Sequence, residues 1–467
     1  MRLNEIKILV AVITIGVILR VIAINQHDFW FDEAFTFHIA KLPLQDLLKA
    51  VLTDNNPPLY YMLIHFLLKL GSNEIFLRLP SLFANIIVLI ILYHTLKKFI
   101  SPKVGLIATA LFSVSPLTIY IATEARLHSL AMLMGILLVS LFLKLIKKRK
   151  PLITAMFIFI ASLGLYTQYY IALLFLPFTW IVLRYKTSIA RKSWIIIVMG
   201  ASATLVPWLF LSKLASHNVC SCPSTPLSLP SSLVSPVIGG VGEFTLRSFP
   251  TLPLPIFLLF TATAFIYFLF FLKGLTQNRS ITLIYLMPLG TLSLLGLFLS
   301  VFSPKAFAVF SPIYFAIVAI GITSYRKSGL IIIIIGLLLT TINAIQTTNP
   351  FFAGTRLKPI DAIIKNSRSV PVAHTSLLTF YSLNYYSQGN QKHILITQNP
   401  LSAETLKFIG GQKQDVNVST SQLWLVDTEK WTEKDSRKTA LQTLFNNYEV
   451  KKKDSVNTIS VYLLRKK

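Results

Sequence analysis

Long apolar segments dominate the first three quarters of this 467-residue chain. Most are close to the twenty residues that a helix needs to cross a bilayer, and short basic or polar stretches separate them. Eleven segments fit this description, over residues 6–25, 79–99, 103–122, 126–146, 151–165, 168–185, 193–213, 251–272, 281–302, 306–325 and 328–347. The pattern predicts an all-α polytopic membrane protein with about eleven transmembrane helices.

The last part of the chain follows a different pattern. Apolar and polar residues alternate over Gln422–Val426 and Ile459–Leu464, which is the two-residue period of a half-buried strand. Turn-forming residues separate these stretches. We therefore expect two domains, a transmembrane domain over residues 1–347 and a small α/β domain over residues 348–467.

Composition supports the membrane class and excludes a nucleic-acid-binding protein. Hydrophobic residues make up 54% of the chain and charged residues 13%, whereas soluble proteins carry about 25% charged residues. The net charge of +26 would suggest nucleic acid in a soluble protein. Here the basic residues cluster between apolar segments, as the positive-inside rule describes. We therefore expect membrane lipids, and no nucleic acid, as partners.

The orientation depends on the apolar stretch 58–70, which is too short to cross a bilayer. If it lies as a juxtamembrane helix after Pro57 and Pro58, the basic loops all face one side of the membrane. Eight of the nine acidic residues before residue 348 then face the other side. We expect a cytoplasmic N-terminus, an uncleaved first span because no small-residue cleavage site follows it, and an extracytoplasmic C-terminal domain. The other large outer loops are residues 26–78 and 214–250.

Two cysteines, Cys220 and Cys222, stand in the polar loop before the eighth span. A Cys-x-Cys pair is too close for an unstrained disulfide, and no neighbouring residue completes a metal site. We interpret them as incidental thiols.

An acidic pair, Asp32-Glu33, follows the first span and stands among aromatic residues that include Trp30. Desolvation by aromatic rings raises the affinity of a carboxylate for a proton, which suits a general base for a hydroxyl nucleophile. The alternative is that one acid caps a short interfacial helix over residues 33–41, where a negative charge at the N-terminus is favourable. Both interpretations can hold together.

Polar residues also gather at the predicted outer ends of later spans. Arg126 carries a planar guanidinium that matches phosphate oxygens, and Glu124 precedes it by two residues. The alternatives are an interhelical hydrogen-bond network for Glu124 and Arg126, and snorkelling to lipid headgroups for Arg78 and Lys305. Tyr60 follows the double proline at the start of the short helix.

In this order, the motifs resemble those of the GT-C membrane glycosyltransferases. The resemblance is to glycosyltransferase family 39, the relatives of protein O-mannosyltransferases, and to lipid A aminoarabinose transferases. It extends over residues 1 to about 190 and rests on the following motifs: Asp32-Glu33, Pro57-Pro58-Leu59-Tyr60-Tyr61, Arg78-Leu79-Pro80-Ser81, Ser115-Pro116 and Glu124-Ala125-Arg126. The chain departs from its relatives at Phe35, Asn56 and Lys305, where they often carry arginine, histidine and arginine.

The resemblance implies a membrane enzyme, a hexosyl- or pentosyltransferase. It implies a polyprenyl-phosphate-sugar donor and a hydroxyl acceptor, either protein, glycolipid or cell-envelope polysaccharide, on the outer face of the membrane. Asp32 is then the base of an inverting transfer, and Glu33 assists it or binds the acceptor. We expect Arg126, Arg78 and Lys305, in this order, to bind the donor phosphate.

The remaining expectations concern the sugar site and metal ions. We expect Glu124, Tyr60 and Trp30 in the acceptor or sugar pocket. Relatives include metal-dependent and metal-independent enzymes, so a divalent cation (Mg²⁺ or Mn²⁺) is compatible with the resemblance, although the sequence contains no metal-ligand motif.

Two other functions stay open from the sequence. A lipid or sugar transporter of similar span count would place its ionisable residues near the bilayer midplane, often on broken helices. Here they lie at the outer ends of spans. A non-catalytic envelope assembly protein is the second alternative, against which the intact Asp32-Glu33 pair argues.

Overall fold

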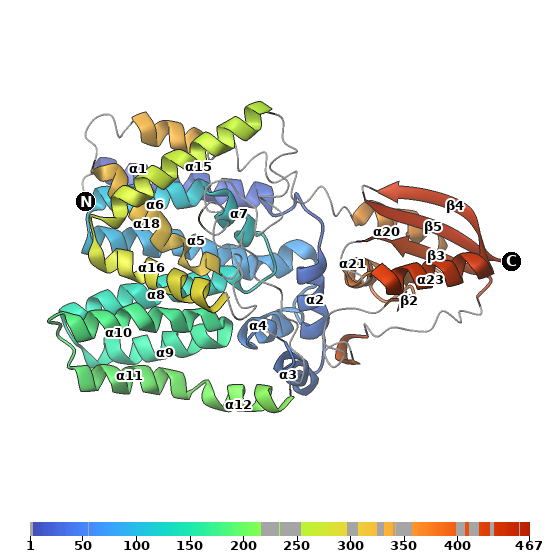
Figure 1. The fold of residues 1–467 in the computed structure, drawn as a ribbon, viewed down its shortest axis with the longest axis horizontal. Coiled ribbons are helices and arrows are strands. Elements are labelled where there is room, and N and C mark those ends of the chain that lie inside the picture. Colours follow the sequence, from blue (N-terminus) through green and yellow to red (C-terminus); the bar gives the residue numbers. More distant parts are fainter. Residues whose placement is uncertain are drawn as a thin grey trace. The chain divides into compact units, whose positions relative to one another are not determined.

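The computed structural model describes most of the chain, and it divides into two compact units (Figure 1). Unit 1 contains residues 1–26, 78–211 and 221–351, and unit 2 contains residues 27–77, 212–220 and 352–467. The described residues are 3–54, 56–215, 233, 254–296, 307–324, 331–339, 341, 357–397, 407–410, 420–429, 434–456 and 458–467.

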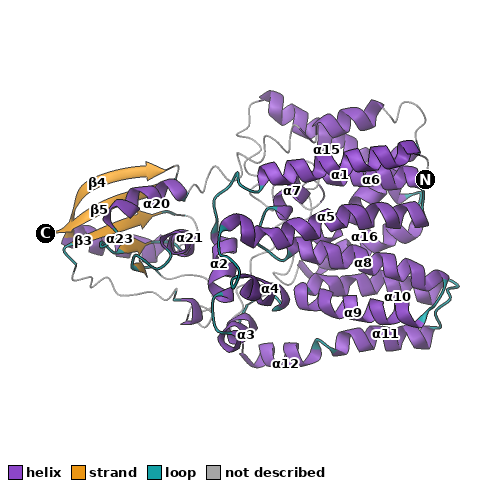
Figure 2. Cartoon of the chain, turned by 180° about the vertical axis from the view of Figure 1, so that it is seen from behind, coloured by secondary structure: helices purple, strands orange, loops and turns teal. Residues whose placement is uncertain are grey.

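The secondary-structure elements that the structure describes in unit 1 are all helices, joined by short loops (Figure 2). Each of the eleven predicted spans contains helical residues, the last over residues 331–339. The labelled helices are α1 (Leu3–Ala23), α5 (Glu74–Phe99), α6 (Pro102–Val114), α7 (Pro116–Ala122), α8 (His128–Lys147), α9 (Pro151–Thr167), η1 (Tyr169–Leu174), α10 (Phe175–Arg184), α11 (Arg191–Ala203), α12 (Val206–Ala215), α15 (Leu254–Leu275), α16 (Arg279–Gly296), η3 (Ala308–Phe310) and α18 (Ser311–Thr323).

Several of these helices are long and apolar enough to cross a membrane. Among the described residues there are four such helices, or six if each of two bent pairs forms one span. The bent pairs are α6 with α7, at 64°, and α11 with α12, at 42°. The chain is thus a multi-pass membrane protein, while the count of eleven crossings and the orientation stay predictions.

The bend between α6 and α7 is stabilised by a buried arginine from α1. Pro116 has no backbone N–H, so the carbonyl of Phe112 loses its regular helical donor. The Thr118 hydroxyl donates to this carbonyl instead, at 2.6 Å, together with Nη2 of Arg20 at 3.4 Å. Nη1 of Arg20 donates to the Ser113 carbonyl at 2.7 Å. Its Nε also donates to Oδ1 of Asn85 at 3.0 Å. Arg20 therefore links α1, α5 and the broken helix.

Helices α15 and α18 approach each other closely at two glycines. A Cβ atom on Gly321 would lie 1.9 Å from the Phe270 carbonyl oxygen, and one on Gly274 would lie 1.9 Å from the Ile317 carbonyl oxygen. Such a contact between helix backbones requires glycine on both sides, as is common where membrane helices pack.

Unit 2 begins with three short helices from the first long loop, α2 (Phe31–Ala40), α3 (Leu44–Leu52) and α4 (Leu59–Leu67). The short helix predicted after the double proline is confirmed as α4, whose nine residues are too few to cross a bilayer. The Asp54 carboxylate accepts hydrogen bonds from the Tyr61 hydroxyl at 2.7 Å and the Asn56 amide at 3.2 Å. These bonds hold the proline turn against the helix that it starts.

The predicted α/β fold of the C-terminal part is also confirmed. Its five-stranded sheet has the order β2-β1-β3-β5-β4, with β1 parallel to β2 and β3, and β5 antiparallel to β3 and β4. The two alternating stretches of the sequence are β3 and β5. The elements are α20 (Lys358–Ile364), η5 (Lys365–Ser367), β1 (Val372–His374), α21 (Leu377–Ser387), β2 (His393–Leu395), β3 (Gln422–Asp427), α23 (Lys434–Asn447), β4 (Tyr448–Val456) and β5 (Ile459–Lys466).

Alternation along β3 separates two hydrophobic cores. Trp424 and Val426 face a cluster that includes Ile360 of α20. Leu423 and Leu425 face a second cluster that includes Leu444 of α23. The sheet therefore has helices on both faces, as an α/β layer structure requires, and α23 covers one face in Figure 1.

Polar contacts join the first loop to the C-terminal α/β part within unit 2. The Asp28 carboxylate accepts backbone N–H groups of Leu357 at 2.7 Å and Lys358 at 2.9 Å. The Lys358 ammonium lies 2.8 Å from the Glu74 carboxylate, and the Phe29 ring stacks on Tyr385 with 4.3 Å between centroids. The predicted domain boundary after residue 347 lies outside the described residues and stays a prediction.

Candidate active site

The acidic pair lies in the first turn of α2, where the two carboxylates have different surroundings. Glu33 is fully buried. Its Oε2 lies 3.5 Å from the backbone N–H of Trp30, which precedes the helix, and 3.9 Å from Nδ1 of His27. This is the helix-capping geometry that the sequence left open as an alternative, and Glu33 adopts it.

Asp32 is the more accessible member of the pair. It is partly exposed, and its carbonyl accepts the Thr36 hydroxyl at 2.8 Å. Consecutive residues on a helix point about 100° apart, so the two carboxylates face different directions. Asp32 is therefore the better candidate for a general base, because the Glu33 carboxylate caps the start of α2.

Two predicted pocket residues belong to the same unit as the acids. Trp30 is the residue before α2 and is partly exposed. Tyr60 lies in the first turn of α4 and is 1% exposed. Helices α2 and α4 pack against each other, so unit 2 gathers Asp32, Glu33, Trp30 and Tyr60 on two neighbouring helices.

The predicted phosphate ligands that the structure describes lie in unit 1. Arg78 is fully buried, and its Nη1 donates to the Ile24 carbonyl at the end of α1, at 2.7 Å. Ser81, one turn further along α5, donates to the Arg126 carbonyl at 2.9 Å. The Arg78-Leu79-Pro80-Ser81 motif thus ties α5 both to the end of α1 and to the turn that carries Arg126.

That turn separates α7 from α8. Arg126 is partly exposed, whereas Glu124 is fully buried and accepts a hydrogen bond from the Tyr120 hydroxyl. The backbone N–H of Arg126 donates to the Glu124 carbonyl at 2.8 Å. Arg126 is more exposed than Arg78, which makes it the better candidate for a ligand that enters from outside. Lys305 lies outside the described residues, as do Cys220 and Cys222.

Metal ligands do not cluster in the part of the chain that the structure describes. No group of three or more His, Cys, Asp or Glu side chains there is arranged to hold an ion. Metal dependence therefore stays a question for experiment.

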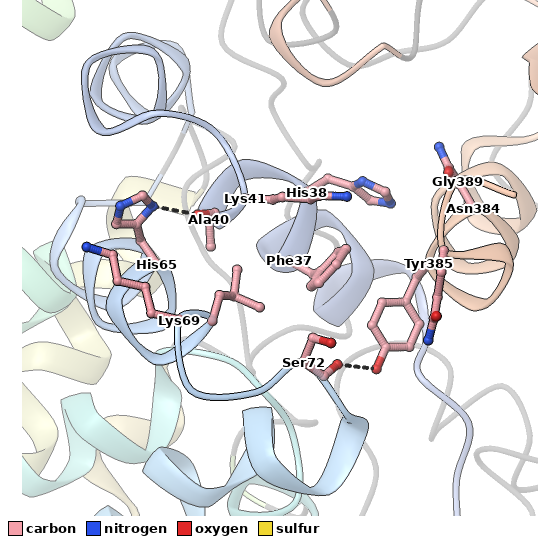
Figure 3. A pocket seen from close by; sticks show the side chains of 12 residues that line it. Phe37, His38, Ala40, Lys41, His65, Lys69, Ser72, Asn384, Tyr385 and Gly389 are labelled. Atoms are coloured by element: carbon pink, nitrogen blue, oxygen red, sulfur yellow. Dashed lines mark hydrogen bonds between the residues drawn. The ribbon is translucent and has the colours of Figure 1, made fainter.

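A pocket of about 550 Å³ lies in unit 2, and sequence reasoning did not find it. Figure 3 shows His65 and Lys69 on one side, Tyr385 and Asn384 on the other, and Phe37 between them. The Tyr385 hydroxyl donates to the Ser72 carbonyl at 2.8 Å, and His65 Nδ1 lies 2.8 Å from the Ala40 carbonyl. The pocket lies between helices that are about 320 residues apart in sequence, so no local sequence motif predicts it.

Next to this pocket, unit 2 contains three closely spaced histidines. His374 Nε2 lies 2.8 Å from His393 Nδ1, and His38 Nε2 lies 3.1 Å from the Tyr381 carbonyl. Burial lowers the pKa of His38 to about 4. Burial, with the charge of His38, lowers the pKa of His393 to about 4, and burial with the charge of His393 lowers that of His374 well below its usual range. All three are therefore neutral at pH 7.

One family model matches the chain, that of the dolichyl-phosphate-mannose-protein mannosyltransferases, over residues 55–210. The matched segment contains the proline turn, Arg78, Glu124 and Arg126, and it begins after Asp32. No curated protein matches the chain in sequence.

Solved structures match the fold over nearly the whole chain. ArnT from Cupriavidus metallidurans in the apo state has a TM-score of 0.64 at 11% identity, with 97% of each chain covered. The same protein bound to undecaprenyl phosphate has a TM-score of 0.58 at 10% identity, again with 97% of each chain covered. The Archaeoglobus fulgidus oligosaccharyltransferase in complex with Zn and sulfate has a TM-score of 0.57 at 11% identity, covering 97% of this chain and 72% of the other.

The fold is thus that of the GT-C membrane glycosyltransferases. The resemblance to this superfamily that the motifs predict is confirmed, both by the mannosyltransferase family model and by the fold of ArnT and the oligosaccharyltransferase.

Proposed function

We propose that this protein is a glycosyltransferase that moves a sugar from a polyprenyl-phosphate-linked donor to a hydroxyl acceptor on the outer face of the membrane. The observation that carries the proposal is the position of Asp32. It is a partly exposed carboxylate in the first turn of α2, and its neighbour Glu33 is buried at the helix start. The GT-C fold supports a lipid-linked donor, since one ArnT structure contains undecaprenyl phosphate.

The proposed reaction is a single displacement at the anomeric carbon. The acceptor hydroxyl oxygen forms the new bond as Asp32 takes its proton, and the bond from the anomeric carbon to the phosphate oxygen breaks. The polyprenyl phosphate leaves with the electron pair. A phosphate is a good leaving group without protonation, so the reaction needs one base and cations that bind the phosphate. A glycoside hydrolase, by contrast, needs both an acid and a base.

The other predicted residues take supporting roles. Arg126 would pair with the donor phosphate through its guanidinium fork, with Arg78 and Lys305 as further cations. Glu124, Tyr60 and Trp30 would contact the sugar or the acceptor. Because Arg78 donates to the Ile24 carbonyl and is buried, we rank Arg126 first.

The direct test is transfer from a defined donor. The full-length protein in membranes is incubated with a panel of polyprenyl-phosphate sugars, hexoses and pentoses separately, with envelope extract as the source of acceptors. The expected result is release of polyprenyl phosphate and one sugar-bearing product, identified by mass spectrometry. A parallel series with EDTA, followed by Mg²⁺ or Mn²⁺, decides metal dependence.

Two results of this assay would contradict the proposed transferase activity. Binding of every donor without release of polyprenyl phosphate, in membranes that contain the natural acceptor pool, would contradict the transferase. Movement of the intact lipid-linked sugar across the bilayer would indicate the transporter alternative.

A further inference from the structure

The pocket in unit 2 is lined by positively charged side chains and by no negatively charged ones. Lys41, at the end of α2, and Lys69, after α4, both line it and are exposed. Neither Asp nor Glu is among its lining residues. The Lys41 ammonium lies 5.9 Å from the Phe37 ring centroid, and that of Lys69 lies 5.1 Å from the Phe66 ring centroid. A hollow lined by one sign of charge attracts the opposite charge, so the pocket suits an anion.

The same pocket has features that suit a sugar ring. Phe37 and Tyr385 meet edge to face, with 4.8 Å between their centroids at 84°, and the bond from Tyr385 to Ser72 fixes the phenol. Asn384 and Gln388 add amide groups, which both donate and accept hydrogen bonds. A volume of about 550 Å³ lies within the range of small-ligand sites, about 300–1,000 Å³.

The backbone of one pocket wall is unusual. At the end of α21, Gln388 has φ of 52° and Gly389 has φ of 79°. Gln388 is the single non-glycine residue with positive φ in the described part of the chain. An L-residue in this conformation costs free energy that glycine avoids, and such residues gather at ligand sites. The position keeps a long amide side chain at the pocket where glycine would fit the backbone better.

We propose that this pocket binds an anionic saccharide, a sugar that carries phosphate or carboxylate. It would be a segment of the acceptor, which makes the acceptor class an anionic glycan. The binding itself stands without the transferase, but its assignment to the acceptor rests on the proposed function.

The test uses the full-length protein in nanodiscs of zwitterionic lipid, titrated by calorimetry. The probes are an oligogalacturonate, a phosphorylated malto-oligosaccharide, the unphosphorylated malto-oligosaccharide and inorganic phosphate. The expected result is binding of both anionic sugars, weakened by salt, with much weaker binding of the neutral sugar and of phosphate alone. Equal binding of neutral and charged sugars would overturn the anionic assignment, and equal binding of phosphate would overturn the saccharide.

Matched variants localise the binding. Lys41→Gln with Lys69→Gln should weaken binding of the anionic sugars about tenfold or more, as the loss of charge-assisted hydrogen bonds implies. Lys392→Gln with Lys438→Gln, which removes two exposed charges elsewhere in the same unit, should not. Gln388→Gly should keep the fold, because glycine accepts the positive φ, and should still weaken binding. Unchanged affinity in both pocket variants would overturn the site.

The two proposals fail separately. If binding is localised to this pocket and no donor supports transfer, the transferase fails and the pocket stands. If transfer occurs and the two-lysine variant has an unchanged KM for the acceptor, the acceptor assignment fails and the transferase stands. Asp32→Asn should bind the anionic sugars normally.

A second cavity carries a separate inference, in unit 1. It has a volume of about 400 Å³ at the C-terminal ends of α5 and α8, and Lys97, Lys98 and Lys144 line it. Both helices are long and apolar enough to cross a membrane, so their charged ends mark the bilayer surface. The Lys97 ammonium lies 3.6 Å from the Glu5 carboxylate, which leaves the lining with an excess of positive charge.

Thr95 also lines this cavity, and its hydroxyl differs in hydrogen bonding from those of other helical threonines. Thr95 is 3% exposed, and its hydroxyl has no hydrogen-bond partner among the described residues. Other helical threonines, such as Thr154 and Thr167, donate to the carbonyl four residues earlier. A buried hydroxyl without a partner is costly unless a ligand in the cavity completes it.

We infer that the cavity binds the phosphodiester headgroup of an anionic phospholipid, since basic pockets between membrane helices suit such headgroups. Native mass spectrometry of the protein from nanodiscs with phosphatidylglycerol and phosphatidylcholine should show retained phosphatidylglycerol. Lys98→Gln with Lys144→Gln, and separately Thr95→Val, should reduce the retained lipid severalfold, whereas Lys148→Gln with Lys150→Gln should not. Equal retention of both lipids, or the same loss in the control, would overturn the site.

Discussion

Arg20 in unit 1 and Asp28 in unit 2 are both largely buried charges whose main partners are backbone groups, yet they hold different structures together. Arg20 fills a local gap, because its guanidinium supplies donors to carbonyls at the break between α6 and α7. Asp28 joins segments about 330 residues apart, through the N–H groups of Leu357 and Lys358. Unit 1 thus combines helix packing with buried arginines, and unit 2 combines two hydrophobic cores with polar contacts and neutral imidazoles. Unit 1 should respond to changes in volume, and unit 2 to changes in charge and pH.

The largest effect should follow from Arg20→Met. The change removes the donor of two buried acceptors, the Ser113 carbonyl and Oδ1 of Asn85, and each unsatisfied buried acceptor costs about 1–3 kcal/mol. We expect a loss of at least about 3 kcal/mol and little folded protein, measured by thermal unfolding in detergent. Arg184→Met, at an exposed arginine at the end of α10, is the control. Equal stability of the two variants would contradict the role of Arg20.

The next effect tests the glycine contact between α15 and α18. Gly321→Ala places a Cβ 1.9 Å from the Phe270 carbonyl oxygen, so the helices must separate at a cost of about 3 kcal/mol. Gly290→Ala in α16 makes the same chemical change where no atom lies within 4 Å. It should be neutral or stabilising by up to about 1 kcal/mol, because alanine favours a helix. The midpoint of thermal unfolding should move in opposite directions, and a common direction would refute the close contact.

A smaller and more local effect should follow from Asp28→Ala in unit 2. The variant loses hydrogen bonds of a charged acceptor, worth about 2 kcal/mol, and the contact with Lys358. Hydrogen exchange should accelerate over α20 and leave α6 and α7 unchanged. Asp46→Ala removes a half-exposed ion pair with Lys49 and should cost about 0.5 kcal/mol or less. Acceleration in unit 1 of the Asp28 variant would show that the two units are not independent.

The smallest effect is the share of one histidine in the pH dependence of unit 2. The pKa values of His38 and His393 fall from 6.5 to about 4 on folding, so between these values the unfolded chain binds more protons than the folded one. Stability is therefore complete above about pH 6.5 and decreases as the pH falls towards 4, by about 1–2 kcal/mol for each of the two histidines between pH 7 and pH 5. His393→Gln should flatten this dependence in hydrogen exchange of β1 and β2. An unchanged slope would mean that other groups titrate.

Local sequence patterns predicted the secondary-structure elements, but they did not predict the long-range contacts. The proline pair at residues 57–58 and the alternation in 422–426 act over a few residues, so α4 and β3 follow from the sequence. The hydrogen bonds of Arg20 were not predicted, because it is one polar residue in an apolar span and its partners at residues 112–118 are about 90 positions away.

The candidate site shows the same limit. The motifs located Asp32, Arg78 and Arg126, because each stands at the end of a predicted span. The burial of Glu33 and Arg78 depends on contacts that no motif shows. Lys41 and Lys69 are ordinary surface lysines in the sequence, and only the packing of α21 near α2 and α4 makes them pocket residues.

The central claim is that Asp32 is the base of sugar transfer, and the most direct test is the turnover of Asp32→Asn with an identified donor and acceptor. Asparagine keeps the shape of the side chain and cannot take the proton. Turnover should fall about 100-fold or more, as loss of a general base implies, with unchanged donor binding and normal protein abundance. Asp46→Asn, in the same unit, should keep full turnover. Full turnover in Asp32→Asn would contradict the account and move the search for the base to Glu33 and then Glu124.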